Sequence, residues 1–447
     1  MPSSVPDTWH CFHLLYERNK MNLPFSKIRK FILIAAVVLL AGGIGYQLGT
    51  RKTQISISPE KRLILHRDTP SYASVDFALF WDVWQRLFRF YIDRASMDPQ
   101  KMVWGAISGM VNSLGDPYTA FLPPKENKEF KEDLGGAFEG IGAQLGMREN
   151  RVIVVAPLKG NPAEKAGVLA GDTILKVDEE ETAGWSVQQA VTKIRGLRGT
   201  TVTLTILHEK STKPVDISIV RDTIVVPSVE TWVKTPAEIT EISGTSGIRE
   251  LSAKPGKVAY LRLSRFGDRT NGEWDKAVDD MLAAQRANGK LKGMIFDLRN
   301  NPGGYLEGAV FIASEFIKSG VVVSQANSDN TKQEYPVVRA GRLLNIPLIV
   351  LINKGSASAS EIVAGALRDY KRATLVGETS FGKGSVQTPQ ELGGGAGLHI
   401  TTAKWLLPKG DWIHKIGVKP DVEVKLDDVT NATADAQLAK AVELLLK

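Results

Sequence analysis

Cysteine is almost absent from this sequence of 447 residues, which contains a single one, Cys11. One thiol cannot form an intramolecular disulfide, a cysteine-built zinc site or an iron–sulfur cluster. Histidine is also scarce, because the chain has six, and none shows the H-E-x-x-H spacing of zinc proteases. We therefore expect a protein without a metal ion or another cofactor.

A strong charge of one sign is lacking as well. Lysine and arginine number 56 and aspartate and glutamate 49, which gives a formal net charge of +7. Residues 1–30 carry five bases and two acids, a charge of +3, so the remainder of the chain carries only +4. That charge is too mild for the clustered basic face of a nucleic-acid-binding protein. We expect no nucleic-acid partner.

Long apolar runs are rare, and the clearest is Phe31–Thr50, which follows Lys27, Arg29 and Lys30. Its 20 uncharged residues would extend about 30 Å as a helix, enough to cross a bilayer. The basic flank predicts a membrane anchor with the rest of the chain extracytoplasmic, in the cell envelope or periplasm. A cleaved signal peptide with Phe31–Leu40 as its apolar region, and hence an exported protein, stays open.

The rest of the chain divides by its glycine, proline and hydrophobic patterns. We expect an N-terminal tail with the apolar segment at 1–50, a polar stalk at 51–72, a helical part at 73–134, a compact unit of short strands at 135–226 and a core at 227–447. Within the core, residues 230–256 are rich in Gly, Ser and Thr and are expected to form a linker or an insertion. Alternating strands and helices from residue 257 onward predict a layered sheet-and-helix core in an α/β (α+β) multidomain protein.

Aromatic residues recur at helical spacing between Phe77 and Tyr91. Such a stripe is more often one buried face of a helix than a ligand site. We therefore expect a helix from about Asp76 whose aromatic face packs in a core.

The stretch Gly355–Glu361, G-S-A-S-A-S-E, follows an apolar strand and begins a helix. A serine at this point lies at the positive end of the helix dipole, which stabilises an alkoxide or an oxyanion. Ser358 and Glu361 also match the capping box S-x-x-E, a purely structural role. By itself, this stretch favours capping.

The stretch Gly377–Lys383 has three chemical interpretations and one structural one. It fits the P-loop pattern G-x-x-x-x-G-K, but Gly384 stands where Ser or Thr should follow, and no helix is expected there. Ser380 and Lys383 match the S-x-x-K of penicillin-recognising enzymes, which should begin a long helix. Lys383 could instead be a general base with its pKa lowered by burial, with Gln387 orienting its amine. An exposed loop lysine is the simplest alternative.

Two further features bear on catalysis. Asp297–Gly304, D-L-R-N-N-P-G-G, ends a buried strand, and its glycines could direct backbone N–H groups to a substrate oxygen. A tight turn explains the same residues. His399 and His414 are the histidines of the C-terminal half, and neither has an acidic partner that the spacing supports, which disfavours a Ser-His-Asp triad.

Taken together, five ordered motifs resemble those of the carboxy-terminal processing proteases, also called tail-specific proteases. They are WGAISGMVNSLGDPYTAFLPP at 104–124, GAFEGIGAQLG at 136–146, DLRNNPGG at 297–304, NKGSASASEIVAGALRD at 353–369 and VGETSFGKGSVQ at 376–387. The resemblance extends from about Asp76 to the C-terminus. It implies a serine-type endopeptidase that processes or degrades proteins from their C-termini.

The resemblance also implies roles for single residues. The second serine of GSASASE, Ser358, would be the nucleophile, Lys383 the general base, and Gln387 the residue that steadies the lysine. The N–H groups of Gly304 and Ala359 would form the oxyanion hole. The chemistry would be acyl transfer through a Ser-Lys dyad.

Residues 135–226 resemble a PDZ domain, and the resemblance places Gly140, Ile141, Gly142 and Ala143 in its carboxylate-binding loop. Successive backbone N–H groups form a nest for a carboxylate, and the peptide then adds as a strand. Partners would be protein or peptide substrates with free C-termini. A catalytically silent PDZ scaffold that binds tails remains the alternative, although it would not need the Ser-Lys pair.

Overall fold

The structure of the chain is a computed structural model. It describes the ranges 76–209, 211–243, 254–289, 291–329, 331–425 and 435–447, the backbone of two strands within 53–67, and single residues at 36, 38, 39 and 42. The chain divides into two compact units, Met1–Met97 and Asp98–Lys447. No helix in these described parts has the length and apolar character needed to span a bilayer. The predicted anchor Phe31–Thr50 lies outside the described residues, apart from those single positions.

The first unit contains β1 (Thr53–Ile57), β2 (Leu63–Arg67), α2 (Ala78–Phe90) and the short helix η1 (Arg94–Ser96). β1 and β2 pair antiparallel, so the segment 51–72, expected to be a stalk, contains a strand pair. The aromatic rings of α2 contact one another, with 5.6 Å between the ring centroids of Trp84 and Phe88. No residue of α2 is buried, and Trp81 is 55% exposed. The expected buried aromatic face is therefore not found among the described residues of this unit, where the rings contact their neighbours along the same helix.

The second unit begins with α3 (Pro99–Asn112), β3 (Ala120–Leu122) and α4 (Pro124–Gly135). The Asp98 side chain caps α3 by accepting hydrogen bonds from the N–H groups of Gln100 and Lys101. Gly136 ends α4 with a φ of 63°, a conformation that glycine adopts without steric cost.

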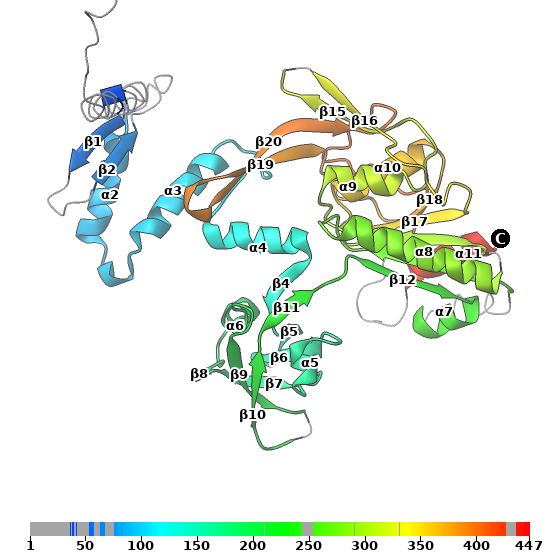
Figure 1. The fold of residues 1–447 in the computed structure, drawn as a ribbon, viewed down its shortest axis with the longest axis horizontal. Coiled ribbons are helices and arrows are strands. Elements are labelled where there is room, and N and C mark those ends of the chain that lie inside the picture. The colour runs from blue at the N-terminus through cyan, green and yellow to red at the C-terminus, as the bar shows by residue number, and fades with distance from the viewer. Residues whose placement is uncertain are drawn as a thin grey trace, which may run out of the picture. The chain divides into compact units, whose positions relative to one another are not determined.

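A sheet domain with its own core follows. It contains β5 (Ala143–Arg148), β6 (Arg151–Pro157), α5 (Pro162–Lys165), β7 (Thr173–Val177), β8 (Glu180–Glu181), α6 (Val187–Ile194), β9 (Thr201–Leu207) and β10 (Val215–Val220). The strand order is β10-β9-β7-β6-β5, with β8 on β7, so β5 is an edge strand. Alternate residues of β6 and β9, such as Val152 and Leu204, are buried as period-2 patterning requires. β4 (Ala137–Gly140) and β11 (Asp222–Val225) pair antiparallel and connect this domain to the rest of the unit (Figure 1).

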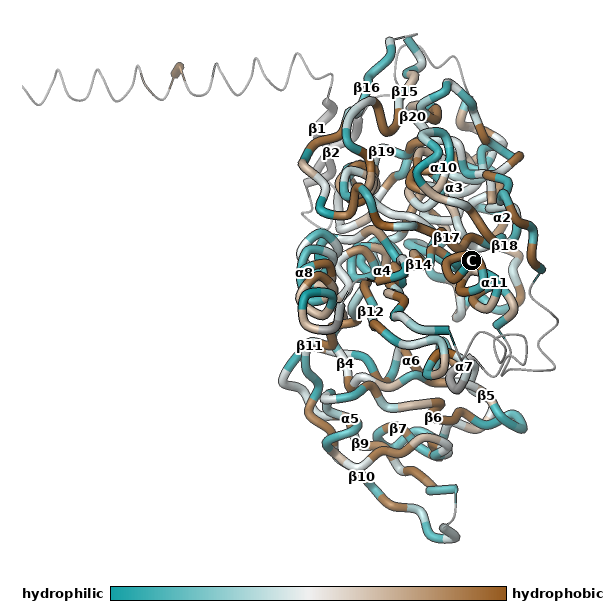
Figure 2. The backbone as a smooth tube through the Cα atoms, turned by 90° about the vertical axis from the view of Figure 1, so that its right-hand side faces the viewer, coloured by the Kyte–Doolittle hydropathy of each residue, from teal (hydrophilic) through white to brown (hydrophobic). Residues whose placement is uncertain are grey.

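The core of the second unit is built on a six-stranded sheet. Its strands, in spatial order, are β12 (Val229–Lys234), β13 (Val258–Leu263), β14 (Gly293–Asp297), β17 (Leu348–Ile352), β18 (Thr374–Gly377) and β21 (Val422–Glu423). All neighbours from β13 to β21 are parallel. β14 and β17 are buried along their whole length, which agrees with the apolar sequence of β17 and of β14 up to its last residue, Asp297 (Figure 2).

Helices cover both faces of this sheet. α8 (Thr270–Asn288), α9 (Leu306–Ala313) and α10 (Ala359–Asp369) share one hydrophobic cluster with the sheet, and α7 (Pro236–Ser243) and α11 (Ala436–Leu446) share the other. Along β13, Leu261 belongs to the first cluster and Tyr260 to the second, as the alternation of a strand requires. The predicted layered α/β core is confirmed.

A second, antiparallel sheet lies beside this core. It consists of β15 (Val321–Asn327), β16 (Lys332–Pro336), β19 (Ser385–Glu391) and β20 (Gly397–Leu406) in the order β16-β15-β20-β19, with β3 on β20 and η3 (Gly393–Gly395) between β19 and β20. The segment 230–256 differs from the expected linker, because β12 pairs with β13 over its whole length and α7 follows it. Only 244–253 of that segment lies outside the described residues.

Candidate active site

A groove of about 630 Å³ brings together residues from distant parts of the second unit. Gly304, Ser358, Ala359, Lys383 and Gln387 all line it. They come from the loops after β14 and β17, from the start of α10 and from the region around the start of β19. The residues predicted for catalysis therefore lie in one site.

Ser358 lies at the sharp turn between β17 and α10. Its backbone has a φ of 54° and a ψ of −116°, a strained conformation for a residue with a side chain. A nucleophilic serine on a tight strand-to-helix turn has this kind of geometry, because the turn presents the hydroxyl at the end of the sheet. The side chain is half-buried at the wall of the groove.

The start of α10 leaves one backbone donor unused. The N–H of Ser358 donates to Glu361 Oε2 at 2.8 Å, and the N–H of Ser360 donates to Ala357 O at 3.2 Å. Within the described part of the chain, the N–H of Ala359 has no hydrogen-bond partner. The first N–H groups of a helix lack partners inside the helix, so this one is free for a ligand.

The glycines of the loop after β14 lie directly against the serine. A Cβ atom on Gly303 would be 2.7 Å from Ser358 Cβ and 3.0 Å from Ala359 N. Gly304 has a φ of 138°, and a Cβ atom there would lie 2.0 Å from Phe266 O. The N–H of Gly304 also lacks a partner among the described residues. Only glycine fits at Gly303 and Gly304. Because this loop lies against Ser358, the free N–H groups of Gly304 and Ala359 belong to residues that line the same groove.

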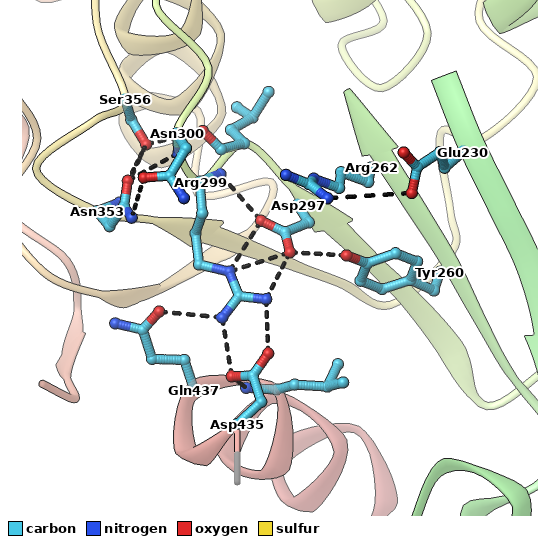
Figure 3. Close-up of polar contacts among 12 residues, drawn as sticks. Glu230, Tyr260, Arg262, Asp297, Arg299, Asn300, Asn353, Ser356, Asp435 and Gln437 are labelled. Atoms are coloured by element: carbon cyan, nitrogen blue, oxygen red, sulfur yellow. Dashed lines mark hydrogen bonds and ion pairs between the residues drawn. The ribbon is translucent and has the colours of Figure 1, made fainter. Parts of the chain in front are cut away.

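Side chains tie the glycine loop to the serine loop (Figure 3). The N–H of Asn300 donates to Asn353 Oδ1 at 2.9 Å, and Asn353 Nδ2 donates back to Asn300 Oδ1 at 2.9 Å. Ser356 Oγ donates to Leu298 O at 2.8 Å, and Ser360 Oγ donates to Asn301 O at 2.7 Å. These bonds fix the distance between the two loops.

The same glycine loop is anchored to α11 by a buried ion-pair network, also shown in Figure 3. Arg299 donates to Asp297 Oδ2 at 2.6 Å and to both oxygens of Asp435 at 2.8 Å, and Tyr260 OH donates to Asp297 at 2.8 Å. Burial alone would raise the pKa of Asp435, but the hydrogen bonds from Arg299 outweigh it and lower that pKa. Asp435 is therefore held as a carboxylate beside the arginine.

Lys383 enters the groove from the loop before β19, and it is not an exposed loop lysine. Burial lowers the pKa of Lys383, although the negative charges of Glu361 and Asp116 act in the opposite direction. Its Nζ lies 5.2 Å from the ring centroid of Tyr118. A lysine in such surroundings loses its proton more easily than a lysine in water, as a general base must.

Ser358 and Lys383 are joined through one oxygen atom. Their backbone N–H groups donate to Glu361 Oε2 at 2.8 Å and 2.9 Å, respectively. The two nitrogen atoms are therefore at most 5.7 Å apart, the length of 2.8 Å plus 2.9 Å. The residue predicted as nucleophile, Ser358, and the residue predicted as base, Lys383, therefore have neighbouring backbones in space, although 25 positions separate them in the sequence.

Comparison with known proteins decides the family. The model of peptidase family S41 matches residues 257–424, and the model of the PDZ domain matches residues 140–219. The chain is 39% identical to a carboxy-terminal-processing protease of Bartonella bacilliformis over 349 residues, which cover 78% of this chain and 75% of that protein. The chain belongs to the carboxy-terminal processing proteases.

Other comparisons agree with this family of serine-type peptidases. The chain is 38% identical to the carboxy-terminal processing protease CtpA of Bacillus subtilis over 331 residues, 74% of this chain and 66% of that protein. It thus spans 66% of the length of that relative. A Bacteroides fragilis structure assigned to the S41 proteases has a TM-score of 0.50 at 17% identity, covering 85% of this chain and 93% of that one, and shows the same fold.

Gln387 of this protease lines the groove, and its side-chain amide donates to residues other than the lysine. Its Nε2 donates to Ser385 Oγ at 3.0 Å and to Thr401 Oγ1 at 3.1 Å. Among the described residues, no hydrogen bond joins Gln387 to Lys383 Nζ. The steadying role of Gln387 stays a prediction, because the two bonds fix its amide and leave its Oε1 available.

The alternatives to a Ser-Lys site lack the structure they need. β19 follows Lys383, so neither the P-loop nor the S-x-x-K interpretation has its helix. His399 lines the groove, and burial and the charge of Lys383 lower its pKa. No carboxylate is hydrogen-bonded to His399 or His414 in the described parts of the chain, and His414 stacks on Trp412 with 5.0 Å between ring centroids.

Sequence reasoning missed three residues around the lysine. Asp116 and Tyr118 belong to a G-D-P-Y segment whose sequence is typical of a turn, and Glu361 matches the pattern of a helix cap. In the structure Tyr118 lines the groove, while Asp116 and Glu361 act on the charge of Lys383. Their place in two of the family motifs was the available signal, but only folding brings the segments together.

The four residues predicted for carboxylate binding lie apart from the groove. They connect the end of β4 to the start of β5, beside α6. The N–H groups of Ile141 and Gly142 have no partner among the described residues, and Gly142 has a φ of 74°. Gly142 is tightly packed, since a Cβ atom there would lie 2.5 Å from Asn161 Cβ. This loop of the PDZ domain offers adjacent free donors at the edge strand β5.

Proposed function

We propose that this chain is a serine endopeptidase that processes or degrades proteins from their C-termini with a Ser358–Lys383 dyad. The observation that carries the proposal is the shared hydrogen-bond acceptor: both backbones donate to Glu361 Oε2, and both side chains line one groove. The strained turn at Ser358 and the lowered pKa of Lys383 support the same roles.

The proposed reaction is acyl transfer in two halves. In the first, uncharged Lys383 Nζ accepts the hydroxyl proton of Ser358 as Oγ attacks the carbonyl carbon of the substrate. Lys383 then gives that proton to the leaving amine when the C–N bond breaks, and the acyl group stays on Ser358 as an ester. In the second half, water attacks the ester and gives a proton to Lys383, which returns it to Ser358 Oγ as the new C-terminus leaves.

The carbonyl oxygen becomes negatively charged in both halves. The free N–H groups of Gly304 and Ala359 are the donors proposed to stabilise this charge. Ala359 also lies at the first turn of α10, where the helix dipole favours an anion. Such preformed donors stabilise the transition state more than the ground state.

The PDZ domain is proposed to bind the C-terminus of the substrate. Its carboxylate would accept hydrogen bonds from the loop of Gly140, Ile141, Gly142 and Ala143, and the peptide would add to the free edge of β5. The unpaired N–H groups of Ile141 and Gly142 and the edge position of β5 support this proposal.

A membrane tether and an extracytoplasmic location are proposed from the sequence. The support is the uncharged run Phe31–Thr50 behind a basic flank. Alkaline carbonate extraction of membranes from cells that express the full chain tests the tether, and protease added to intact spheroplasts tests the side. Release by carbonate, or protection from the protease, would contradict this part of the proposal.

The central proposal is tested with the full chain and its Ser358→Ala variant. Each is given one apolar-tailed peptide with either a free or an amidated C-terminus, and products are identified by mass spectrometry. We expect cleavage by the wild type alone and a preference for the free acid. Equal cleavage of both peptides would remove carboxylate recognition. Binding of the free acid by both proteins without cleavage would support the silent scaffold instead.

A further inference from the structure

We infer that Glu361 is a positioning residue of this site, which holds the serine and lysine segments together through one buried carboxylate. The inference rests on the proposed Ser-Lys mechanism and adds a residue to it. The helix-cap role that the sequence indicates accounts for only part of what the Glu361 carboxylate does.

The Glu361 carboxylate is completely buried and accepts four hydrogen bonds. Its Oε1 accepts from Ser380 Oγ and from the N–H of Gly382, both at 2.6 Å. Its Oε2 accepts from the N–H groups of Ser358 and Lys383 at 2.8 Å and 2.9 Å. Three of these four donors therefore come from the loop that carries the lysine, not from the helix that Glu361 helps to cap.

Burial of an unpaired carboxylate is costly unless donors satisfy it. No lysine or arginine forms an ion pair with Glu361 in the parts of the chain that the structure describes. A carboxylate has acceptor sites for about four donors, and here all four are used. Because these four donors satisfy the buried carboxylate, losing any of them should be costly, and the two segments are held in place.

The lysine loop has two further bonds, one to Val418 and one to the serine segment. Ser380 Oγ also accepts from the N–H of Val418 at 2.6 Å, and the N–H of Phe381 donates to Ser356 O at 3.0 Å. Glu361 therefore lies at the centre of a cross-linked turn. Lys383 cannot move relative to Ser358 without breaking a bond to Glu361, and reacting groups need this kind of fixed geometry.

The charge of Glu361 has a second, separate consequence. Burial lowers the pKa of Lys383, and the Coulombic fields of Glu361 and Asp116 raise it. The other groups that face the lysine are the Tyr118 ring and His399. Replacing Glu361 by glutamine removes one of the two raising charges, so the acid limb of the pH–rate profile should move to lower pH.

The test uses a fluorophosphonate probe, which forms a covalent bond to a nucleophilic serine. The rate of labelling of the full chain is measured against pH for the wild type and for Glu361→Gln. Glutamine keeps the shape of the glutamate side chain. However, one of its two terminal atoms is an NH₂ donor, which would face the N–H or O–H donors that bind the carboxylate. We expect the plateau rate to fall on the order of 10²-fold, as a shift of about 1 Å in a reacting group would cause. We also expect the acid limb to move to lower pH.

Glu315→Gln is the matched control. Glu315 is equally buried, accepts hydrogen bonds from Trp274 and Arg342, and does not line the groove. Its replacement should lower the unfolding midpoint without changing the labelling rate or its pH limb. Ser358→Ala shows which labelling belongs to the active site.

Three outcomes decide the inference. If Glu361→Gln is labelled at the wild-type rate with an unchanged acid limb, the inference is overturned. A slower labelling rate with an unmoved acid limb would also overturn it, because that result indicates structural damage alone. A wild type that is labelled no faster than Ser358→Ala contradicts the proposed function itself. If Glu361→Gln does not fold, Ser380→Ala keeps the charge and removes one of the four bonds to Glu361 together with the bond from the N–H of Val418, and it should slow labelling with the limb unchanged. An unchanged rate in that variant would overturn the inference.

Discussion

At the scale of single residues, the proposed site depends on backbone positions with no room for a larger side chain and on a lysine whose pKa responds to its surroundings. Gly304 touches the backbone of Phe266, and Ser358 adopts a strained turn. Lys383 is kept from water, so its amine can be neutral where an ordinary lysine is charged. Strained or desolvated groups of this kind cost stability, and they concentrate at functional sites.

Replacing Gly304 by alanine should abolish the oxyanion donor. The new Cβ would meet Phe266 O at 2.0 Å, and the φ of 138° is unfavourable for alanine, so the loop must move. Losing one such donor lowers turnover by about 10²–10³-fold. Turnover of the apolar-tailed peptide measures it, with Gly272→Ala, a glycine with open space around it, as the control. A fully active Gly304→Ala variant would contradict the proposed oxyanion hole.

The pH dependence of turnover should report Lys383. Burial lowers its pKa from the ordinary 10.5, and catalysis needs the unprotonated amine, so activity should rise with pH and reach its plateau below the pH at which an ordinary lysine titrates. Lys383→Arg should be inactive throughout, because a guanidinium stays protonated. A profile of kcat/KM against pH tests both statements, and an acid limb at the ordinary lysine value would refute the first.

At the scale of elements, three loops at one edge of the sheet are fixed by different means. Glu361 joins the loops before α10 and before β19, and the Asn300–Asn353 pair joins the glycine loop to the serine loop. Arg299 then connects the glycine loop to α11, a helix far along the chain. The position of the proposed oxyanion donors therefore depends on α11, which contributes none of the proposed catalytic residues.

Asp435→Asn should loosen α11 from the glycine loop. It leaves the buried Arg299 with an incomplete set of acceptors, which costs about 3 kcal/mol of unfolding free energy. Because Arg299 lowers the pKa of Asp435, the stabilisation is complete above the ordinary pKa of 3.8 and is lost as the pH falls through the lowered value. Urea unfolding at neutral pH measures the loss. Glu443→Gln, in a half-exposed pair on the same helix, should change stability less, and an equal loss in both variants would contradict the special role of Asp435.

At the scale of the whole molecule, a PDZ domain and a peptidase core share one chain. Arg195, at the end of α6, pairs with Glu132 of α4 at 3.4 Å, and its guanidinium lies 4.3 Å from the Phe138 ring centroid. Arg198 instead pairs with Asp222 at 2.9 Å. α4 also supplies Phe130 to the wall of the groove, so one helix contacts both the PDZ domain and the site.

Gly142→Ala should separate tail recognition from chemistry. The added Cβ would lie 2.5 Å from Asn161 Cβ and would displace the loop with the free N–H groups. We expect the preference for a free over an amidated C-terminus to disappear, while fluorophosphonate labelling of Ser358 continues at the wild-type rate. Gly160→Ala is the control, since Gly160 has a similar φ of 76° and open space around it. A retained preference would contradict the proposed binding loop.

Much of the core could be predicted because its strands are short, apolar and bounded by turns. β9 and β13 are strands of this kind, and α10 begins one residue after Ser358, within the stretch where the sequence predicts the start of a helix. β12 could not be predicted, because an edge strand such as Val229–Lys234 needs only one apolar face and lies next to a polar segment. The bonds between Glu361 and the lysine loop could not be predicted either. A glutamate at this position matches a helix cap whether or not its carboxylate also binds a second, distant loop.

The most direct measurement of the central claim is peptide turnover by Lys383→Ala with its fold verified by circular dichroism. The dyad predicts a fall of at least about 10²-fold, the contribution of a general base. Lys409→Ala, an exposed lysine away from the groove, should match the wild type. A folded Lys383→Ala variant that turns over peptide at the wild-type rate would contradict the Ser-Lys mechanism.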